Sequence, residues 1–259
     1  MIQDFEDALL SVYREDPCRT LANAFSKTRG LIDDFKTDYR EIDGDVEFLK
    51  LWDEHSLHVY WKQDDEFQLN RSFMEEAKFI LLHDVYREEI PFERFSNVRS
   101  YFRIIHRHDK VVEPELPSRF TFKDVDTVDE TEEVSDLIGR CYKDLKPTAG
   151  EVEGWTGHEV FDEKLWVWVF DEEKKDYAGL GIAEIDRTVP EASLEWIQIL
   201  PEYSGYGLGK ALVYELLGRV DGKVDYTTVG GEYDTDNSPM EFYKRCGFQG
   251  DDIWWVLRK

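Results

Sequence analysis

A glycine-rich turn between a strand pattern and a helix pattern constrains this chain more than any other stretch. Residues 194–217 read LEWIQILPEYSGYGLGKALVYELL, with glycine at 205, 207 and 209. The first seven residues favour an extended strand, and apolar residues then recur every four positions from Leu208 to Val220. A strand that leads through a glycine loop into a helix directs several N–H groups and the positive end of the helix dipole at one point. This stretch therefore predicts an anion site, most naturally for a phosphate.

Two common phosphate loops do not fit this stretch. A Walker loop needs Ser or Thr after the Gly-Lys pair, but Ala211 follows Lys210, and Ser204 stands where the first glycine should be. A dinucleotide fingerprint counted from Gly205 and Gly207 needs a glycine at 210, where the chain has lysine. The pattern that remains is [QR]-x-x-G-x-[GA], to which residues 204–209, S-G-Y-G-L-G, correspond with serine at the first position.

These residues closely resemble the pyrophosphate loop of the GNAT superfamily of acetyl-CoA-dependent N-acyltransferases. Residues 237–248, NSPMEFYKRCGF, resemble the late motif N-x-x-A-x-x-[LF]-Y-x-K-x-G-F of the same superfamily. Read without the resemblance, this second stretch is a short helix with Ser238 as N-cap, Glu241 completing a capping box and Gly247 ending it. The chain departs from the family at Ser204, where arginine or glutamine is usual, and mildly at Met240.

Glycine also marks a boundary between two parts of the chain. Only Gly30 and Gly44 precede residue 117, whereas the other 15 of 17 glycines follow it, and residues 111–117, VVEPELP, read as an extended linker. We therefore expect a domain over 1–116 and a second over 117–259. The first has helical patterns and is expected to be mainly helical, with no internal repeat and no recognised role; the patterns cover residues 5–13, 21–35, 46–52 and 73–85, followed by a strand at 101–106.

The second domain reads as an ordered α/β series. Strands are expected at 119–125, 165–170, 177–186, 194–200, 225–230 and 253–257, and helices at 130–142, 149–156, 208–220 and 239–246. In the third strand, alternation places Gly179, Gly181 and Ala183 on one face, so another element can pack closely there. The fold class is thus α/β (α+β), and the order resembles the GNAT fold, a mixed, mostly antiparallel central sheet flanked by helices.

Composition excludes several kinds of partner. The net charge of −25, from 32 basic and 57 acidic residues, repels nucleic acid and anionic lipid, whereas it attracts a cationic amine or simply keeps the protein soluble. No run of 18 apolar residues exists, and the first residues do not form a signal peptide. Cys18, Cys141 and Cys246 are far apart, which predicts neither disulfides nor structural zinc and favours a cytoplasmic location. The oligomeric state stays open.

The resemblance implies that acetyl-CoA is the acetyl donor. Its pyrophosphate would contact the loop, and its pantetheine arm would pair with the preceding strand at Ile197 and Ile199, where a backbone amide can act as an oxyanion hole. Asn237 either bonds the coenzyme or caps the strand exit. The loop residues in this role are Ser204, Gly205, Tyr206, Gly207, Leu208, Gly209 and Lys210.

Two residues are expected to carry the chemistry. Tyr243 matches the tyrosine that protonates the departing thiolate in many relatives, because a phenol with a pKa of about 10 is a suitable weak acid; otherwise it is a half-buried helix aromatic. Glu195 is expected to share a face with Ile197 and Ile199 and to help deprotonate the amine, or else to be a solvated strand residue. Glu232 is the reserve choice for the base.

Weaker signals are weighed against ordinary structural roles. Four tryptophans either line an acceptor pocket or belong to the core. His106 and His108 alternate on a strand, but no third metal ligand has fixed spacing, so exposed histidines are the simpler interpretation. Cys246 allows a ping-pong mechanism, although burial in the motif helix is the simpler interpretation. Residues 234–237 lack the glycine and glutamate of a calcium loop, so no metal site is predicted. The four tryptophans are Trp155, Trp166, Trp168 and Trp196.

The sequence therefore predicts an enzyme that transfers an acetyl group from acetyl-CoA to a primary amine of a small molecule or peptide by direct attack. The alternative is a catalytically weak coenzyme A-binding module whose N-terminal domain docks a partner. Ser204 favours the alternative, whereas Tyr243 and the three loop glycines favour the enzyme.

Overall fold

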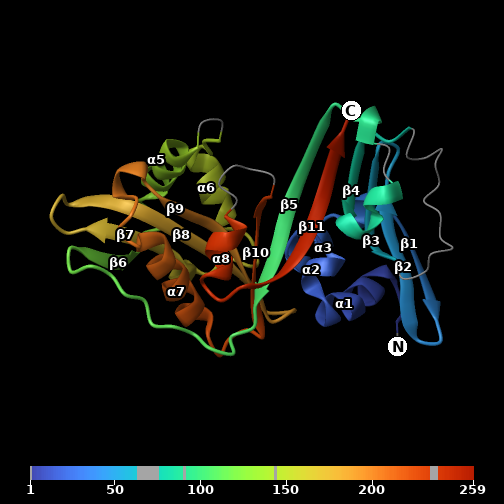
Figure 1. Ribbon diagram of the computed structural model, residues 1–259, viewed down its shortest axis with the longest axis horizontal. Helices are drawn as coiled ribbons and strands as arrows, with labels where there is room; N and C mark the ends of the chain where they lie inside the picture. Colours follow the sequence, from blue (N-terminus) through green and yellow to red (C-terminus); the bar gives the residue numbers. More distant parts are fainter. Residues whose placement is uncertain (1, 63–75, 90–91, 143–144, 234–238) are drawn as a thin grey trace. The chain divides into compact units, whose positions relative to one another are not determined.

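The computed structural model describes residues 2–62, 76–89, 92–142, 145–233 and 239–259. The chain divides into two compact units (Figure 1). Unit 1 comprises Met1–Ile105, Gly230–Lys244 and Phe248–Lys259, and unit 2 comprises His106–Val229 and Arg245–Gly247. This division differs from the expected boundary at residue 116, because the last strand of the chain pairs with strands of the N-terminal part.

Unit 1 is a mixed sheet with short helices. Its strands are ordered β1-β2-β3-β4-β11-β5, and all neighbouring pairs are antiparallel except β3 with β4. Helices α1–α3 precede the first strand, and α8 comes from the C-terminal part of the chain. The strands are β1 (Lys36–Ile42), β2 (Asp45–Trp52), β3 (Ser56–Lys62), β4 (Phe79–His83), β5 (Asn97–His106) and β11 (Gln249–Arg258), and the helices are α1 (Phe5–Glu15), α2 (Pro17–Thr20), α3 (Phe25–Arg29) and α8 (Met240–Lys244).

Local signals and one buried cation hold the helices of unit 1. The Asp4 carboxylate caps α1 by accepting from the Asp7 N–H at 2.9 Å, which satisfies one of the helix's unpaired donors. From β5, the buried Arg103 guanidinium donates to the carbonyls of Pro17 and Leu21, both at 2.9 Å, and to the Tyr13 hydroxyl at 2.6 Å. These bonds satisfy a charge that would be costly to bury alone, and they fix α1 and α2 to the sheet.

The N-terminal part is not mainly helical within the described residues. The expected helix over 46–52 is strand β2, and the expected helix over 73–85 gives strand β4 and a 3₁₀ turn over Asp84–Glu89, with 73–75 outside the described residues. A short apolar run has no period that separates a strand from a helix. Pairing decides here: β4 lies between β3 and β11, and β11 is more than 160 residues further along the chain.

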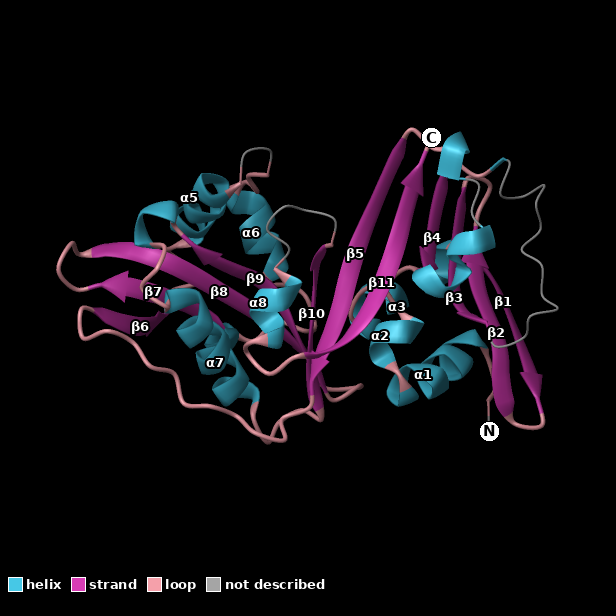
Figure 2. Ribbon diagram, viewed as in Figure 1, coloured by secondary structure: helices cyan, strands magenta, loops and turns pink. Residues whose placement is uncertain are grey.

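Unit 2 follows the expected order of elements. Its strands are ordered β10-β9-β8-β7-β6, antiparallel except for the parallel pair β9 and β10. Helices α5 and α6 lie on one face of the sheet and α7 on the other (Figure 2). The strands are β6 (Phe120–Asp124), β7 (Trp166–Asp171), β8 (Asp176–Asp186), β9 (Glu191–Ile199) and the part of β10 (Tyr226–Glu232) up to Val229, and the helices are α5 (Thr131–Cys141), α6 (Ala149–Trp155) and α7 (Leu208–Val220).

The expected close approach to the glycine face of β8 is confirmed. A Cβ atom at Gly181 would lie 2.8 Å from Leu212 Cδ1 on α7, and one at Gly179 would lie 2.4 Å from Ile199 Cδ1 on β9. Leu212 and Leu216 have 0% exposed surface, and a fully buried leucine contributes roughly 1.5–3 kcal/mol. Packing against β8 therefore fixes the position of α7, and with it the loop that begins the helix.

The two units share a strand-pairing pattern that the sequence does not reveal. In unit 2, Leu194 pairs with Val229 in the parallel ladder, and the next residue, Glu195, is the extra residue of a β-bulge against β8. In unit 1, Val59 pairs with Leu82 in the parallel ladder, and the next residue, Tyr60, is the extra residue of a bulge against β2. The chain thus contains a repeat in its strand pairing, although no glycine loop marks it in the N-terminal part.

Candidate functional site

The predicted anion loop joins β9 to α7 in unit 2. After a 3₁₀ turn over Pro201–Tyr203, Gly205 and Gly207 take φ values of +87° and +78°, which L side chains rarely adopt. A Cβ atom at either glycine would meet no heavy atom within 4 Å, so the space in front of the loop is open. The backbone conformation, and not packing, therefore requires glycine at these positions.

The N-terminus of α7 is suited to an anion. Gly207 is its N-cap and provides no side-chain bond, and the first backbone bond runs from the Ala211 N–H to the Gly207 carbonyl at 3.1 Å. The first turn holds no acidic residue, although α1, α5 and α6 all begin with acidic ones. In a chain with net charge −25, a helix start that combines N–H donors with Lys210 is a distinct positive point.

The strand before the loop carries the bulge at Glu195. The β8–β9 register shifts between Ile182, which pairs with Trp196, and Ala183, which pairs with Leu194. The expectation that Glu195 shares a face with Ile197 and Ile199 rested on simple alternation, and the bulge breaks that alternation. Bulges are common beside active sites because they redirect a side chain.

Glu195 is half-buried and bonded to its own strand. The Ser193 hydroxyl donates to Glu195 Oε1 at 2.5 Å. Opposite Ser193 on β8 lies Glu184, whose side chain is 13% exposed and whose Oε1 is 4.0 Å from His158 Nδ1. Two carboxylates and an exposed imidazole therefore lie near the bulge, and sequence spacing gave no sign of Glu184 or His158.

An aromatic group adjoins the bulge through Trp196. The Trp155 and Trp196 rings stack with centroids 5.5 Å apart and an interplanar angle of 16°, and Tyr142 meets Trp196 edge-on at 6.2 Å. The Tyr142 hydroxyl accepts from Gln198 Nε2 at 3.0 Å. Trp155 and Trp196 are half-buried, so this pair can line an acceptor pocket.

The other two predicted tryptophans belong to the core. Trp166 and Trp168 are each 1% exposed. Trp168 stacks on Tyr177 at 4.1 Å and donates from Nε1 to Glu130 at 2.8 Å, and the Tyr177 hydroxyl also bonds Glu130. Burial and Glu130 raise the pKa of Tyr177 above its ordinary value. The core interpretation is therefore confirmed for this pair.

A second group of rings surrounds the loop itself. Tyr203 and Tyr206 meet Phe120 edge-on, with centroids 5.9 and 5.5 Å away. The Arg119 guanidinium lies over all three rings and pairs with Asp171 through Nε–Oδ1 at 2.8 Å and Nη2–Oδ2 at 2.5 Å. No sequence signal indicated this group, because residues on three separate segments form it.

The late motif lies in unit 1, apart from Arg245–Gly247, which belong to unit 2. Helix α8 is shorter than the expected 239–246, and Gly247 follows it with a φ of +100°, as expected for a helix end. Tyr243 is 8% exposed and packs against Phe102 and Phe248 at 6.3 and 5.7 Å. Asn237 and the predicted N-cap Ser238 lie outside the described residues.

The remaining candidates have ordinary surroundings. Glu232 is 44% exposed and pairs with Arg99 at 3.5 Å. Cys246 is 3% exposed, and burial raises the pKa of its thiol to about 11, which opposes a nucleophilic role. His106 is buried and the His108 side chain is 7% exposed, so neither is exposed as expected. Their rings meet edge-on at 5.1 Å, His108 Nε2 lies 2.8 Å from Thr227 Oγ1, and burial lowers the pKa of both.

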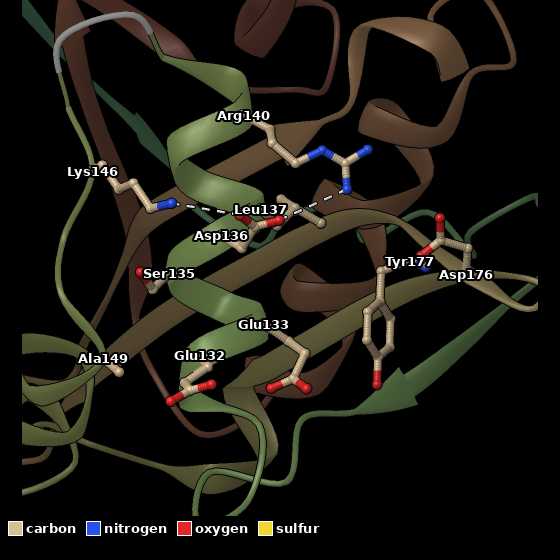
Figure 3. A pocket seen from close by; sticks show the side chains of 10 residues that line it. All are labelled: Glu132, Glu133, Ser135, Asp136, Leu137, Arg140, Lys146, Ala149, Asp176 and Tyr177. Atoms are coloured by element: carbon tan, nitrogen blue, oxygen red, sulfur yellow. Dashed lines mark hydrogen bonds and ion pairs between the residues drawn. The ribbon is translucent and has the colours of Figure 1, made fainter.

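A separate cavity of about 540 Å³ lies beside α5 and contains none of the predicted site residues (Figure 3). Glu132, Glu133 and Asp176 line it, together with Asp136, which pairs with Lys146 at 3.5 Å. Within the described part of the chain, no three His, Cys, Asp or Glu residues are arranged to hold a metal ion. Over those same residues, no helix is both long and apolar enough to cross a bilayer.

Comparisons with known proteins agree with this geometry. Residues 162–250 match the family model described as acetyltransferase (GNAT) domain. A GCN5-related N-acetyltransferase from Sphaerobacter thermophilus superposes with a TM-score of 0.65 at 14% identity, covering 84% of this chain and 78% of that chain. A GNAT-family acetyltransferase from Colwellia psychrerythraea gives 0.62 at 13% identity, covering 100% of this chain and 98% of that chain.

A tandem GNAT protein from the clavulanic acid biosynthesis pathway is also similar in fold, with a TM-score of 0.58 at 13% identity over 98% of this chain and 94% of that chain. No curated protein matches the sequence. At these identities the structural matches show the fold alone, whereas the family model matches the stretch that holds the bulge, the glycine loop and α7. The C-terminal part of the chain, over residues 162–250, therefore carries a GNAT acetyltransferase domain.

Proposed function

We propose that this protein binds acetyl-CoA through the β9–α7 loop and transfers its acetyl group to a primary amine. The observation that carries the proposal is the start of α7: two glycines with positive φ, open space before them, and N–H groups that no side chain caps. These features fit a pyrophosphate. Backbone donors and Lys210 supply the contacts, since Ser204 has no charge. The loop residues of this site are Ser204, Gly205, Tyr206, Gly207, Leu208, Gly209 and Lys210.

The strand β9 supports a place for the pantetheine arm. Its parallel ladder with β10 ends at Leu194 and Val229, and Ile197 and Ile199 lie beyond the last pair. An extended ligand can add to such an edge as a further strand. A backbone amide of this segment then donates to the thioester carbonyl and stabilises the negative charge that develops there during attack.

Glu195 is the proposed base for the acceptor amine. The protonated amine must lose a proton before its nitrogen can attack the carbonyl carbon, and a carboxylate at the bulge can take that proton directly or through a water. The new C–N bond forms as the C–S bond breaks, and the thiolate leaves. We assign protonation of that thiolate to Tyr243. The family resemblance is the reason for linking this residue to the loop.

The surroundings of the bulge favour a cationic acceptor, either a small molecule or a peptide amine. Glu184 and Glu195 provide negative charge, and the Trp155–Trp196 pair provides aromatic faces that attract cations. We propose that unit 1 helps to select this acceptor. No disulfide joins the three cysteines, which suits a reducing compartment such as the cytoplasm.

The alternative is a coenzyme A-binding module with little activity, in which unit 1 docks a partner. Ser204, in place of a charged or amide side chain, is the observation that favours it.

Turnover of acetyl-CoA with a panel of amines separates the two functions. Thiol release should depend on the amine, and a reaction without amine serves as the control. Release with at least one amine, together with a mass gain of one acetyl group on that amine, is the expected result. Measurable coenzyme binding without thiol release for any amine would support the binding module instead.

A further inference from the structure

Arg119, directly before β6, is held rigidly against the end of β7. Its guanidinium forms a two-point ion pair with Asp171, which is 0% exposed. The Asp171 carboxylate also accepts from the backbone N–H groups of Glu173 and Lys174 at 3.0 and 3.2 Å. The Arg119 bond holds the pKa of Asp171 well below its usual range, and the pair stays ionised at neutral pH. A planar guanidinium bound at two points has little freedom to rotate.

The fixed guanidinium lies over two tyrosine rings beside the anion loop. It lies 6.0 Å from the Tyr203 ring centroid and 5.9 Å from that of Tyr206, the two residues that flank Ser204 and Gly205. Phe120 completes the stack at 5.4 Å. Two side chains of the loop therefore rest on a platform that β6 and β7 provide.

The charge balance indicates that Arg119 does not itself neutralise a bound phosphate. Its Nε and Nη2 both donate to Asp171, and Nε also lies 3.4 Å from Glu173. Two carboxylates thus face one guanidinium, whose side chain is only 22% exposed. Arg119 can instead fix the position of the tyrosine rings. The rings in turn set the direction of the loop N–H groups.

We propose that Arg119 is a positioning residue for the coenzyme loop. It acts through Tyr203 and Tyr206 to hold Gly205 and Gly207 in their left-handed conformations before any ligand arrives. Such preorganisation lowers the cost of binding. It matters more here than in a loop with a charged residue at 204, because backbone donors work only when they point at the anion. This inference rests on the proposed function.

The test is Arg119→Lys, which keeps the positive charge but removes the two-point ion pair and the planar group that lies over the rings. In the ligand-free protein we expect amide hydrogen exchange over residues 203–210 to accelerate by about 10-fold. The dissociation constant for coenzyme A, measured by calorimetry, should rise by about 10-fold, and kcat at saturating acetyl-CoA should change by less than about 2-fold. Unchanged exchange in this segment would overturn the inference, even if the wild-type protein bound no coenzyme.

Salt dependence distinguishes positioning from direct contact. If Arg119 touched the phosphate, a charge-removing variant such as Arg119→Gln would flatten the dependence of coenzyme affinity on salt. Positioning predicts weaker binding with the wild-type salt slope, and a flatter slope would contradict it. Lys123→Gln is the matched control, because Lys123 is also a cation of the β6 segment that lies over an aromatic ring, that of Phe170, and pairs with a carboxylate, that of Glu172, at 3.6 Å. It should leave both exchange and affinity unchanged.

A second variant keeps the inference testable if Arg119 variants fail to fold. Tyr206 is 46% exposed, so Tyr206→Ala removes its ring from the platform without opening the core. It should accelerate exchange over 203–210 by about as much as Arg119→Lys. The double variant should be no worse than either single one, because both remove the same contact. Effects that multiply would mean that the two residues act independently, which contradicts the proposal.

Discussion

The parallel strand pair β3–β4 of unit 1 and the parallel pair β9–β10 of unit 2 share one pairing pattern but differ in their side chains. Each ladder begins with the first residue of its strand, Ser56 in β3 and Glu191 in β9, and spans four residue pairs. Each is followed by a bulge, at Tyr60 and at Glu195, and then by a tryptophan. The backbone pairing is therefore common to both units, and only the side chains and the connecting segments differ between them.

The bulge of unit 1 is filled by its own side chains. Tyr60 and Trp61 are 2% and 8% exposed, and Trp61 Nε1 donates to the Val46 carbonyl at 2.8 Å. The Tyr60 hydroxyl lies 3.4 Å from Nδ1 of His58, which is itself buried. In unit 2, Glu195 and Trp196 are half-buried. The bulge of unit 1 is thus part of a core, whereas the bulge of unit 2 carries a half-buried carboxylate.

The crossovers after the two bulges differ in the feature on which the proposed coenzyme binding depends. Residues 200–225 contain the glycine loop and the start of α7, whereas residues 63–78 contain no glycine. An anion loop needs backbone conformations that only glycine adopts at low cost. In the proposed function, strand pairing alone does not make a coenzyme site, because the crossover has to supply the N–H donors.

The largest expected effect is on the base. Glu195→Gln should lower kcat for amine acetylation by about 100-fold, because the carboxylate that accepts the proton is lost. Tyr60→Phe, at the equivalent bulge position of unit 1, should leave kcat unchanged. Steady-state rates at saturating acetyl-CoA measure both. If Glu195→Gln kept the wild-type rate, another carboxylate such as Glu232 would be the base.

The next effect concerns the loop backbone. Gly207→Val should raise the dissociation constant for coenzyme A by at least about 10-fold, because a β-branched residue disfavours the φ of +78° and covers the approach to the N–H groups. Calorimetric titration measures this value.

Gly44→Val is its matched control in unit 1. Gly44 has a φ of +97° and the same open surroundings, so the backbone strain is similar. It should lower the melting temperature without changing coenzyme affinity. Equal loss of affinity in both variants would mean that binding follows overall stability and not the loop.

A smaller effect is an acid sensitivity of unit 1. Burial lowers the pKa of His58 to about 4, whereas the unfolded chain titrates near the ordinary value of 6.5. As the pH falls below 6.5, His58 becomes protonated in the unfolded chain but stays neutral in the folded chain. The free energy of unfolding therefore falls by about 1.4 kcal/mol for each pH unit until about pH 4. Urea unfolding between pH 7 and 5 should show this slope.

His58→Gln should remove that part of the slope. His106 and His108 in unit 2 also have lowered pKa values, so the difference between wild type and variant is the quantity to compare. A slope that stayed the same in the variant would show that His58 is not the group responsible.

The smallest effect is expected at Cys246. Because burial raises the pKa of its thiol to about 11, the thiolate is scarce at pH 8, and direct transfer does not need it. Cys246→Ala should therefore keep kcat within about 2-fold. Acetylated enzyme detected by mass spectrometry in the wild type, and absent from the variant, would instead indicate a ping-pong mechanism.

Much of unit 2 was predictable because its signals are local. The order of strands and helices along the chain, the α7 face and the close approach at Gly179 and Gly181 all follow from periodicity and residue size, and they agree with the structure. In unit 1, β2 and β4 lie where the sequence predicts helices, since a short apolar run has no period that separates a strand from a helix. The last strand, expected in the second domain, pairs with β4 and β5 of unit 1, which lie far away in the sequence.

The candidate site likewise has one part that the sequence predicts and another part that it does not. The loop from Ser204 to Lys210 was found from the sequence, because a left-handed backbone restricts residue type wherever it occurs. The bulge at Glu195, the Trp155–Trp196 stack and the Arg119 platform were not found from it, because each requires residues from separate strands and helices to meet.

The sequence by itself determined the anion loop, the helix behind it and the family of the domain, since glycine positions and helix periodicity act over a few neighbouring residues. Only the tertiary structure decided which carboxylates and rings adjoin the bulge, that Arg119 lies over the rings beside the loop, and that the N-terminal part repeats the parallel pair without its glycines. Strand register and burial are properties of the whole sheet, and no short stretch of sequence specifies them.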